Sequence, residues 1–350
     1  MSSRHTRQAL VALLTSLFLA VSVTSAPAEA RPGRKHTKGS VTWVTDTWVS
    51  GSGTGYALTG TINGSKKRKL LLQYKAPNGW KKLNKTKAVD GNYSFTGTWD
   101  WYGTHKVRVV APQTRKHQKR AFKAHSVNVV PSYAARGMAS DHNLIKNHGL
   151  RERLNPCQTV RYKLNLDDIG DGVLPIINSV LGQFTAATGV QFKYTGRTHT
   201  IPQGLRKQDR NTDLVIAWAT QAERPALVGA VAVSQVVKLG LGRDKHGRVL
   251  SVKQTGVTVN TDATVPGPNQ AVDLALDSPS RATLGMTLLH EIGHSFGLDH
   301  TDQNAAGQTQ LMYYSTDMLP WSDGFFRSLF GAGDLAGLKK VGLAGGCVRG

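Results

Sequence analysis

The stretch HEIGHSFGLDH, from His290 to His300, spaces three histidines in a way that one continuous helix cannot bring together. On a helix, the side chains of His290 and His294 point within about 40° of each other and lie one turn apart, so both can bind one metal ion. If the helix continued, His300 would lie about 15 Å along the axis from His290 and on another face. Gly297 is placed to end the helix, because glycine takes the left-handed conformation at little cost. The spacing therefore predicts a helix that stops near Gly297 and a chain that turns back to bring His300 to the metal.

This set of side chains is typical of a catalytic zinc site. Structural zinc sites are usually closed by four protein ligands, whereas three histidines leave one position open. Glu291 lies about 100° from His290 around the helix, close to the metal but off the ligand direction. Zinc lowers the pKa of a bound water towards about 7, and Glu291 would take the water proton and pass it to the leaving amine. The alternative is that His290 and His294 are two ordinary histidines on an amphipathic helix. The presence of Gly297 and His300 at the required spacing favours a zinc site over this alternative.

The same residues match the signature H-E-x-x-H-x-x-G-x-x-H, so this part of the chain resembles the metzincin zinc peptidases. Metzincins carry a methionine in a tight turn beneath the metal, and Met312 in the run LMYY looks like that residue. The motif with LMYY resembles the matrixin branch, and DLAGL at Asp334–Leu338 resembles the start of the matrixin C-terminal helix. The resemblance covers residues 160–345 and is specific only around the zinc motif and Met312. It implies a twisted, mostly parallel sheet on two long helices, with a cleft between the zinc and an edge strand within Gly229–Gly240.

Three points in this resemblance stay open. No PRCGxPD-like segment is present, so latency through a propeptide cysteine has no support. Tyr314 stands two residues after Met312, as does the switchable metal-binding tyrosine of astacins and serralysins, so it is either an oxyanion stabiliser or an ordinary core or wall tyrosine. The family implies Ca²⁺, for which the run DDIGDG at Asp167–Gly172 is the candidate, although a helix-capping turn fits that run better.

The N-terminus has the layout of a secretory signal peptide over residues 1–30. Arg4 and Arg7 precede the apolar run Leu10–Val23, and the small residues around Ala30 fit a cleavage site. The apolar run is shorter than the roughly 20 residues that span a bilayer, which disfavours a membrane anchor. We therefore expect a secreted, extracellular protein that begins with a flexible basic leader over residues 31–40.

Cys157 and Cys347 are the two cysteines of the chain. In an oxidising compartment two cysteines usually pair, and this bridge would tie together the two ends of one domain. Closing a loop of that length stabilises a fold by about 4–5 kcal/mol in the chain-entropy estimate. The competing interpretation is that Cys157 is a thiolate that caps the zinc in a latent form.

The formal charge of +22 is unevenly distributed along the chain. From Arg31 to Pro156 there are 24 Lys and Arg against 5 Asp and Glu, a balance of +19, whereas Cys157 to Gly350 has 18 against 16, a balance of +2. A basic half favours polyanionic partners, and secretion makes acidic cell-wall polymers better candidates than nucleic acid. A solvated basic face without a partner is the alternative.

The element pattern predicts two domains. Short strand-like runs between turn signals over 41–111 predict an all-β sandwich, which resembles the immunoglobulin-like modules of bacterial secreted proteins. The charge run that follows predicts a basic linker over 112–155. Residues 156–350 mix strands and helices, which predicts an α/β (α+β) domain that carries the zinc site. The expected helices are 171–188, with Asp171 as N-cap, 280–296 and 333–341.

Together these features predict a secreted, monomeric zinc endopeptidase that acts on proteins or peptides. Two alternatives remain at this point. In one, the chain is an adhesion protein whose basic β-domain binds an acidic surface. In the other, it is a zymogen whose residues 31–155 form a removable propeptide.

Overall fold

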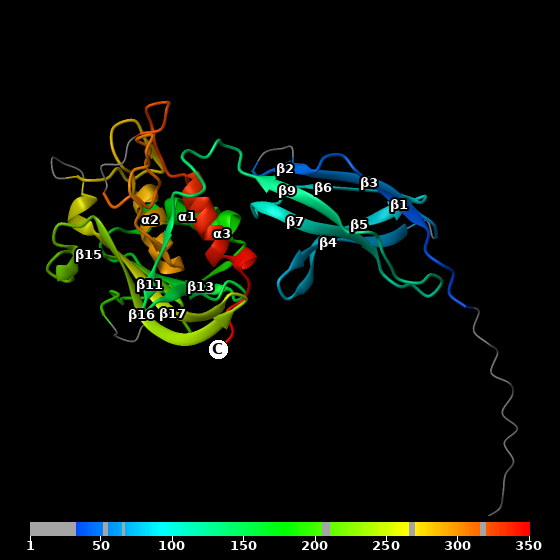
Figure 1. The fold of residues 1–350 in the computed structure, drawn as a ribbon, viewed down its shortest axis with the longest axis horizontal. Helices are drawn as coiled ribbons and strands as arrows, with labels where there is room; N and C mark the ends of the chain where they lie inside the picture. The colour runs from blue at the N-terminus through cyan, green and yellow to red at the C-terminus, as the bar shows by residue number, and fades with distance from the viewer. Residues whose placement is uncertain (1–32, 52–54, 65–66, 205–210, 266–269, 316–319) are drawn as a thin grey trace, which may run out of the picture.

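The computed structural model describes residues 33–51, 55–64, 67–204, 211–265, 270–315 and 320–350. The predicted signal peptide lies outside the described residues. The described part holds two domains side by side, one built from strands alone and one that mixes strands and helices (Figure 1). None of its helices is long and apolar enough to cross a membrane.

The first domain is an all-β body, as predicted. Its strands form one curled sheet in the order β1-β3-β6-β5-β4-β7-β9-β2, with β8 paired to β7, and Figure 1 shows the two layers that result. Alternate side chains point between the layers and bury Trp48, Leu58, Leu72 and Phe95. The strands are β1 (Gly39–Trp43), β2 (Thr47–Val49), β3 (Tyr56–Ile62), β4 (Lys67–Ala76), β5 (Gly79–Val89), β6 (Asn92–Gly97), β7 (Gly103–Ala111), β8 (Arg120–Ala121) and β9 (His125–Val130).

The predicted linker over 112–155 is wrong, because strands of both domains occupy it. β9 pairs with β7 and β2 and buries Val127 and Val129, so it completes the first domain. The short strands β10 (Asn143–Leu144), β11 (Lys146–Asn147) and β12 (Leu150–Leu154) belong to the second domain. β9 is only six residues long and follows directly on the charge run, so its alternating burial leaves a weak signal in the sequence.

The basic leader is also ordered from residue 33 onwards. The backbones of Lys35 and His117 pair in an isolated parallel β-bridge. Thr37 is buried, and its hydroxyl accepts a hydrogen bond from Arg68 Nη2 (2.7 Å). The guanidinium of Arg68 is itself buried in the first domain and also donates to the Asn63 carbonyl (3.0 Å). The described part of the predicted leader, from residue 33 to residue 40, is therefore part of the β-domain.

The second domain has a mixed α/β fold on a mostly parallel sheet. The strand order is β11-β12-β17-β15-β13-β14, in which β12, β17, β15, β13 and β14 run parallel, and β16 pairs antiparallel with β17. The central strand β15 is buried along its whole length. The strands are β13 (Val160–Asn165), β14 (Phe192–Arg197), β15 (Leu214–Ala219), β16 (Ala232–Asp244) and β17 (Gly247–Asn260), with β18 (Asp277–Ser278) paired to β20 (Phe326–Arg327) and β19 (Leu298–Asp299) paired to β10.

Three helices pack beside this sheet, α1 (Leu174–Thr188), α2 (Leu284–Phe296) and α3 (Ala332–Val341). α1 and α2 contact each other where Phe184 of α1 stacks on Phe296 of α2, with ring centroids 5.1 Å apart. The predicted N-cap Asp171 is wrong: it begins the short 3₁₀ turn η1 (Asp171–Val173), makes no cap hydrogen bond and pairs with Arg197. The other 3₁₀ turns are η2 (Pro225–Leu227), η3 (Thr261–Ala263) and η4 (Leu343–Gly345).

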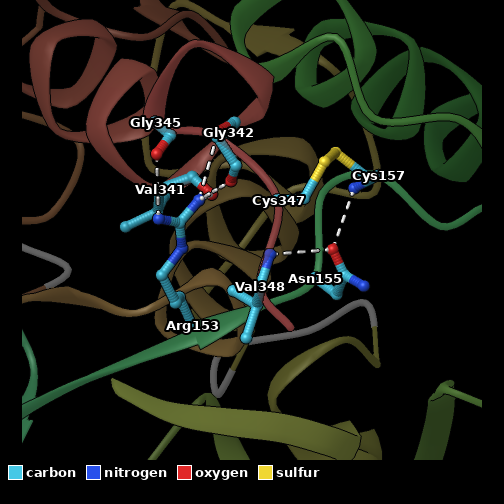
Figure 2. The surroundings of a disulfide bond; sticks show 9 residues. Arg153, Asn155, Cys157, Val341, Gly342, Gly345, Cys347 and Val348 are labelled. Carbon is cyan, nitrogen blue, oxygen red and sulfur yellow. Dashed lines mark hydrogen bonds between the residues drawn. A yellow bond between two sulfur atoms is a disulfide. The ribbon is translucent and has the colours of Figure 1, made fainter. Parts of the chain in front are cut away.

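The predicted disulfide is present, and hydrogen bonds made by the side chains of Asn155 and Arg153 surround it. Cys157 and Cys347 are bonded across a sequence separation of 190. Figure 2 shows Asn155 Oδ1 beside the bridge, where it accepts hydrogen bonds from the backbone N–H groups of Cys157 and Val348, each 3.2 Å long. Buried Arg153 donates to the carbonyls of Val341 (2.8 Å) and Gly346 (2.9 Å). The C-terminal segment is thus fixed to β12 and to the start of β13.

Removal of the bridge should lower stability without changing the fold. We expect the double variant Cys157→Ser with Cys347→Ser to lose about 2–5 kcal/mol of unfolding free energy, because the unfolded chain regains the freedom that the closed loop removed. Urea denaturation followed by circular dichroism measures this. Reduced wild type should unfold like the double variant, and a difference above about 1 kcal/mol between them would count against a purely cross-linking role.

Candidate metal centre

The turn at Gly297 brings the third histidine back to the helix, as predicted. Gly297 has φ 100°, in the left-handed region, and its N–H donates to the His294 carbonyl (2.9 Å). A Cβ at this position would lie 2.1 Å from the carbonyl oxygen of Glu152 in β12, so backbone conformation and space both require glycine. The following strand β19 then pairs with β10, and Asn143 Nδ2 donates to the carbonyl of His300 (2.9 Å).

His290, His294 and His300 converge on one point. Their Nε2 atoms lie 3.1–3.2 Å from one another. Nitrogen ligands at 2.0–2.1 Å from a tetrahedral zinc ion lie about 3.3–3.4 Å apart, so the observed triangle is close to the size that zinc requires. Among the described residues these three side chains form the one group of histidine, cysteine or carboxylate ligands able to hold a metal.

The hydrogen bonds of two histidines fix which nitrogen carries the proton. His290 Nδ1 lies 2.8 Å from the carbonyl oxygen of Leu311, and His294 Nδ1 lies 2.8 Å from that of Leu298. A carbonyl oxygen only accepts, so each Nδ1 is the donor and each neutral ring presents a bare Nε2 lone pair to the other. Burial lowers the pKa of His290 to about 3 and also lowers the pKa of His294, which favours the neutral rings. Facing lone pairs repel unless a cation lies between them, so this donor set fits a metal ion.

Glu291 lies in the same cleft with a perturbed carboxyl group. Its side chain is buried, and burial raises its pKa to about 7, partly offset by a hydrogen bond from the backbone N–H of Ser234 in β16. A carboxyl with a pKa near neutrality both accepts and donates protons readily. The contact with Ser234 links this group directly to the edge strand.

The cleft lies between the edge strand and the helix, as the sequence predicted. It has a volume of about 520 Å³, and its lining includes Gly229–Ser234, Thr287, Glu291 and Tyr314 as well as the three histidines. On its open side β16 has no paired strand among the described residues, so its backbone can receive another chain. Tyr314 lies in the wall, with a side chain 62% exposed, and is not a core residue.

Met312 lies beneath the histidines and packs against the helix backbone. A Cβ on Gly293, in the turn between His290 and His294, would lie 2.6 Å from its sulfur. The Met312 carbonyl accepts a hydrogen bond from the N–H of Thr301 (2.9 Å), which joins this turn to the residue after the third histidine.

The buried carboxylate of Asp334 supports the turn that contains Met312. The sequence predicts Asp334 only as part of the C-terminal helix and indicates no role for it at the site. Asp334 in α3 accepts hydrogen bonds from the N–H groups of Leu311 (2.8 Å), Met312 (3.2 Å) and Gly331 (2.8 Å). Burial raises its pKa to about 6 despite these bonds. Since the Leu311 carbonyl in turn orients His290, Asp334 acts on the metal centre through one peptide unit.

A chain of hydroxyl groups, which the sequence gave no reason to expect, fixes the helix to the sheet. Ser295 Oγ lies 3.0 Å from Ser234 Oγ and 2.9 Å from Thr255 Oγ1, and Thr255 Oγ1 donates to the Gln235 carbonyl (3.0 Å). Ser295 follows His294 on the helix, so it points away from the three histidines and towards the sheet. Spacing along the sequence alone does not show which hydroxyls meet across two strands.

The run Asp167–Gly172, the calcium candidate, forms a turn that leads into α1, without the helix cap expected from Asp171. Asp167 Oδ2 lies 2.7 Å from His199 Nδ1, and Asp171 pairs with Arg197, so two of its carboxylates have side-chain partners. Among the described residues none of these carboxylates belongs to a group of three metal-ligating side chains.

Comparison with known proteins gave no relative: no protein-family model matches the chain, and no curated protein matches it. The candidate metal centre therefore stands on its own geometry.

Replacement of Gly297 should disturb the centre more than the same change at another left-handed glycine. We expect Gly297→Ala to lower the unfolding free energy by at least about 2 kcal/mol, because it adds a clash with Glu152 to the conformational cost. Bound zinc, measured by mass spectrometry of metal content, should fall with it. The control Gly247→Ala has φ 126° and open space around the added methyl, so it should cost about 1 kcal/mol and retain zinc.

Asp334→Asn tests the support beneath His290. The amide offers one acceptor oxygen where the carboxylate offers two, so we expect zinc affinity to fall by about 10–100-fold while the circular dichroism spectrum stays native. Competition with a fluorescent chelator measures the affinity. Asp90→Asn, an exposed turn position in the first domain, removes the same charge and should leave zinc binding unchanged. Equal zinc affinity in the two variants would contradict the positioning role.

Proposed function

We propose that this chain is a zinc-dependent endopeptidase of the metzincin type that hydrolyses peptide bonds in a secreted setting. The observation that carries the proposal is the pair of neutral histidines whose lone pairs face each other beside a third histidine and a buried carboxyl group. His290, His294 and His300 would hold a zinc ion, which would supply an acidified water and polarise the scissile carbonyl. Protein residues supply the remaining functions.

The substrate would lie along the edge strand. An extended peptide can add to the open edge of β16 near Ala232–Ser234, with backbone hydrogen bonds that are independent of its sequence. This arrangement presents a peptide bond to the histidines across the cleft. It favours an endopeptidase, since the strand edge continues past the metal centre on one side and needs no chain terminus.

Glu291 would move the proton. Its carboxyl faces the same cleft as the histidines, and a pKa of about 7 lets it accept a proton from water and donate it to the leaving nitrogen. The hydrogen bond from Ser234 holds the carboxyl against the strand that would bind the substrate. Tyr314 stands in the wall of the cleft, and its hydroxyl would be the group to stabilise a developing oxyanion.

The alternative in which residues 31–155 are a removable propeptide is less well supported. A cut near residue 155 would remove β12 from its pairing with β17, and Asn143 from the carbonyl of His300. It would also remove Glu152, whose carbonyl packs on Gly297. The proposed enzyme therefore includes residues 143–154, and the intact mass of the secreted protein tests this directly.

Glu291→Gln separates catalysis from metal binding. We expect caseinolytic activity to fall by at least about 10²-fold, because the amide cannot take a proton, while one zinc per chain is retained. Glu223→Gln, an exposed carboxyl outside the cleft, is the control for loss of charge and should keep full activity. Activity in Glu291→Gln equal to wild type would refute the proposed mechanism. Removal of zinc with a chelator should abolish wild-type activity, and added zinc should restore it.

A further inference from the structure

The outer face of β4, β5 and β7 is covered by lysines. In β4 the buried side chains Arg68, Leu70 and Leu72 point inward, so the residues between them point out. Cross-strand register extends the same face over β5 and β7. We call this surface the basic face; it consists of Lys67, Lys69, Lys75, Lys82, Lys85, Lys87 and Lys106, with Arg108 above the Trp80 ring at 4.0 Å.

The basic face has a charge arrangement that costs the fold stability. Lys69 and Lys87 are direct cross-strand partners, and like charges in that position repel. The three strands contain no Asp or Glu, and no lysine of the basic face forms a salt bridge with a described carboxylate. An external polyanion would relieve this repulsion.

The positive surface continues across the domain boundary. The two domains touch where Tyr102 N–H donates to the Ala186 carbonyl (2.8 Å). A cavity of about 400 Å³ beside this contact is lined by Lys75 and Lys106 of the basic face and by Lys339 of α3. It shares lining residues Pro77, Leu343 and Ala344 with a cavity of about 960 Å³, whose cations are Arg243, Lys245, Arg248 and Arg349. The one carboxylate side chain there, Asp244, is paired with Arg153 (2.7 Å) and Arg151 (3.2 Å).

We propose that the basic face and these boundary cations form one binding tract for a linear polyol-phosphate polymer of a cell surface. Lysine binds phosphate as a point charge and suits a polymer whose phosphates are not held in fixed orientations. Outward-facing positions recur at about 6.8 Å along a strand and about 4.8 Å between strands on a twisted face, and the lysines occupy several of them. A chain of single bonds can follow that twist, whereas stiff pyranose rings of a polyuronate follow it poorly.

Other polyanions fit the tract less well. Single-stranded nucleic acid is bound through exposed aromatic rings on which bases stack, but Trp80 is already covered by Arg108. A flat membrane would touch only part of a curled sheet.

The tract lies away from the candidate metal centre. β16 begins at the cleft with Ala232 and ends at the boundary cavity with Asp244, twelve residues on, or about 40 Å along an extended strand (Figure 1). A polymer in the tract would therefore hold the enzyme on the surface and leave the cleft open.

Binding of the whole protein to synthetic poly(glycerol phosphate), measured over a range of NaCl concentrations, tests the tract. We expect Lys69→Gln with Lys87→Gln to weaken binding about tenfold at low salt and to reduce the slope of log K against log[salt] by about 1.4, since each lost phosphate contact removes about 0.7. The control Lys146→Gln with Lys193→Gln removes two exposed charges of the second domain and should change binding less than about twofold. Casein hydrolysis should be unchanged in both.

Each other outcome contradicts a stated part of the proposal. Equal weakening by both pairs would mean that net charge, and not the basic face, drives binding. Tighter binding of polygalacturonate, single-stranded DNA or phosphatidylglycerol vesicles than of poly(glycerol phosphate) would assign a different partner. If the first pair lowers the melting temperature, Lys75→Gln with Lys106→Gln must reproduce the loss of binding at the other end of the face, and failure to do so would overturn the tract.

Discussion

The left-handed turn at Gly297 is the constraint on which the candidate metal centre depends. It lets one helix and the segment after it supply three candidate ligands within eleven residues. The turn must be glycine, because β12 occupies the space that a side chain would need. The approach of β12 fixes the path of β10, which pairs with β19 beside His300. The segment preceding the disulfide thus helps to shape a site that lies well over a hundred residues further on.

The support of the centre comes from several layers that contain few charged groups. The Met312 turn is held from below by Asp334 and from the side by Thr301, while serine and threonine hydroxyls hold the opposite face of α2. Burying a hydrogen-bonded hydroxyl group costs less free energy than burying an ion. These hydroxyls therefore fix the helix without placing further charge near the histidines. The carboxyl of Glu291 is then the main titrating group in the cleft besides the histidines, which suits a role in proton transfer.

The sequence predicted the ligands, the break at Gly297, the edge strand, the mixed fold and the disulfide, because each depends on local spacing or on cysteine count. It failed where long-range pairing decides the outcome. β9 follows directly on a charge run and pairs with β7, a contact that local spacing does not reveal. Asp171 was predicted as a helix cap, but in the structure it pairs with Arg197. The hydroxyls of Ser234, Ser295 and Thr255 come from two strands and a helix, so no one-dimensional pattern brings them together.

The bridge between Cys157 and Cys347 has a consequence for the lifetime of the molecule. It encloses almost the whole second domain, so a peptide bond broken anywhere between the two cysteines leaves the two pieces covalently joined. With the peptidase activity proposed above, the protein would be exposed to cleavage by its own copies, most of all in surface loops. Such cleavage products would separate on a denaturing gel only after reduction of the disulfide. Before reduction, the bridge would keep the fragments of the cleaved domain together.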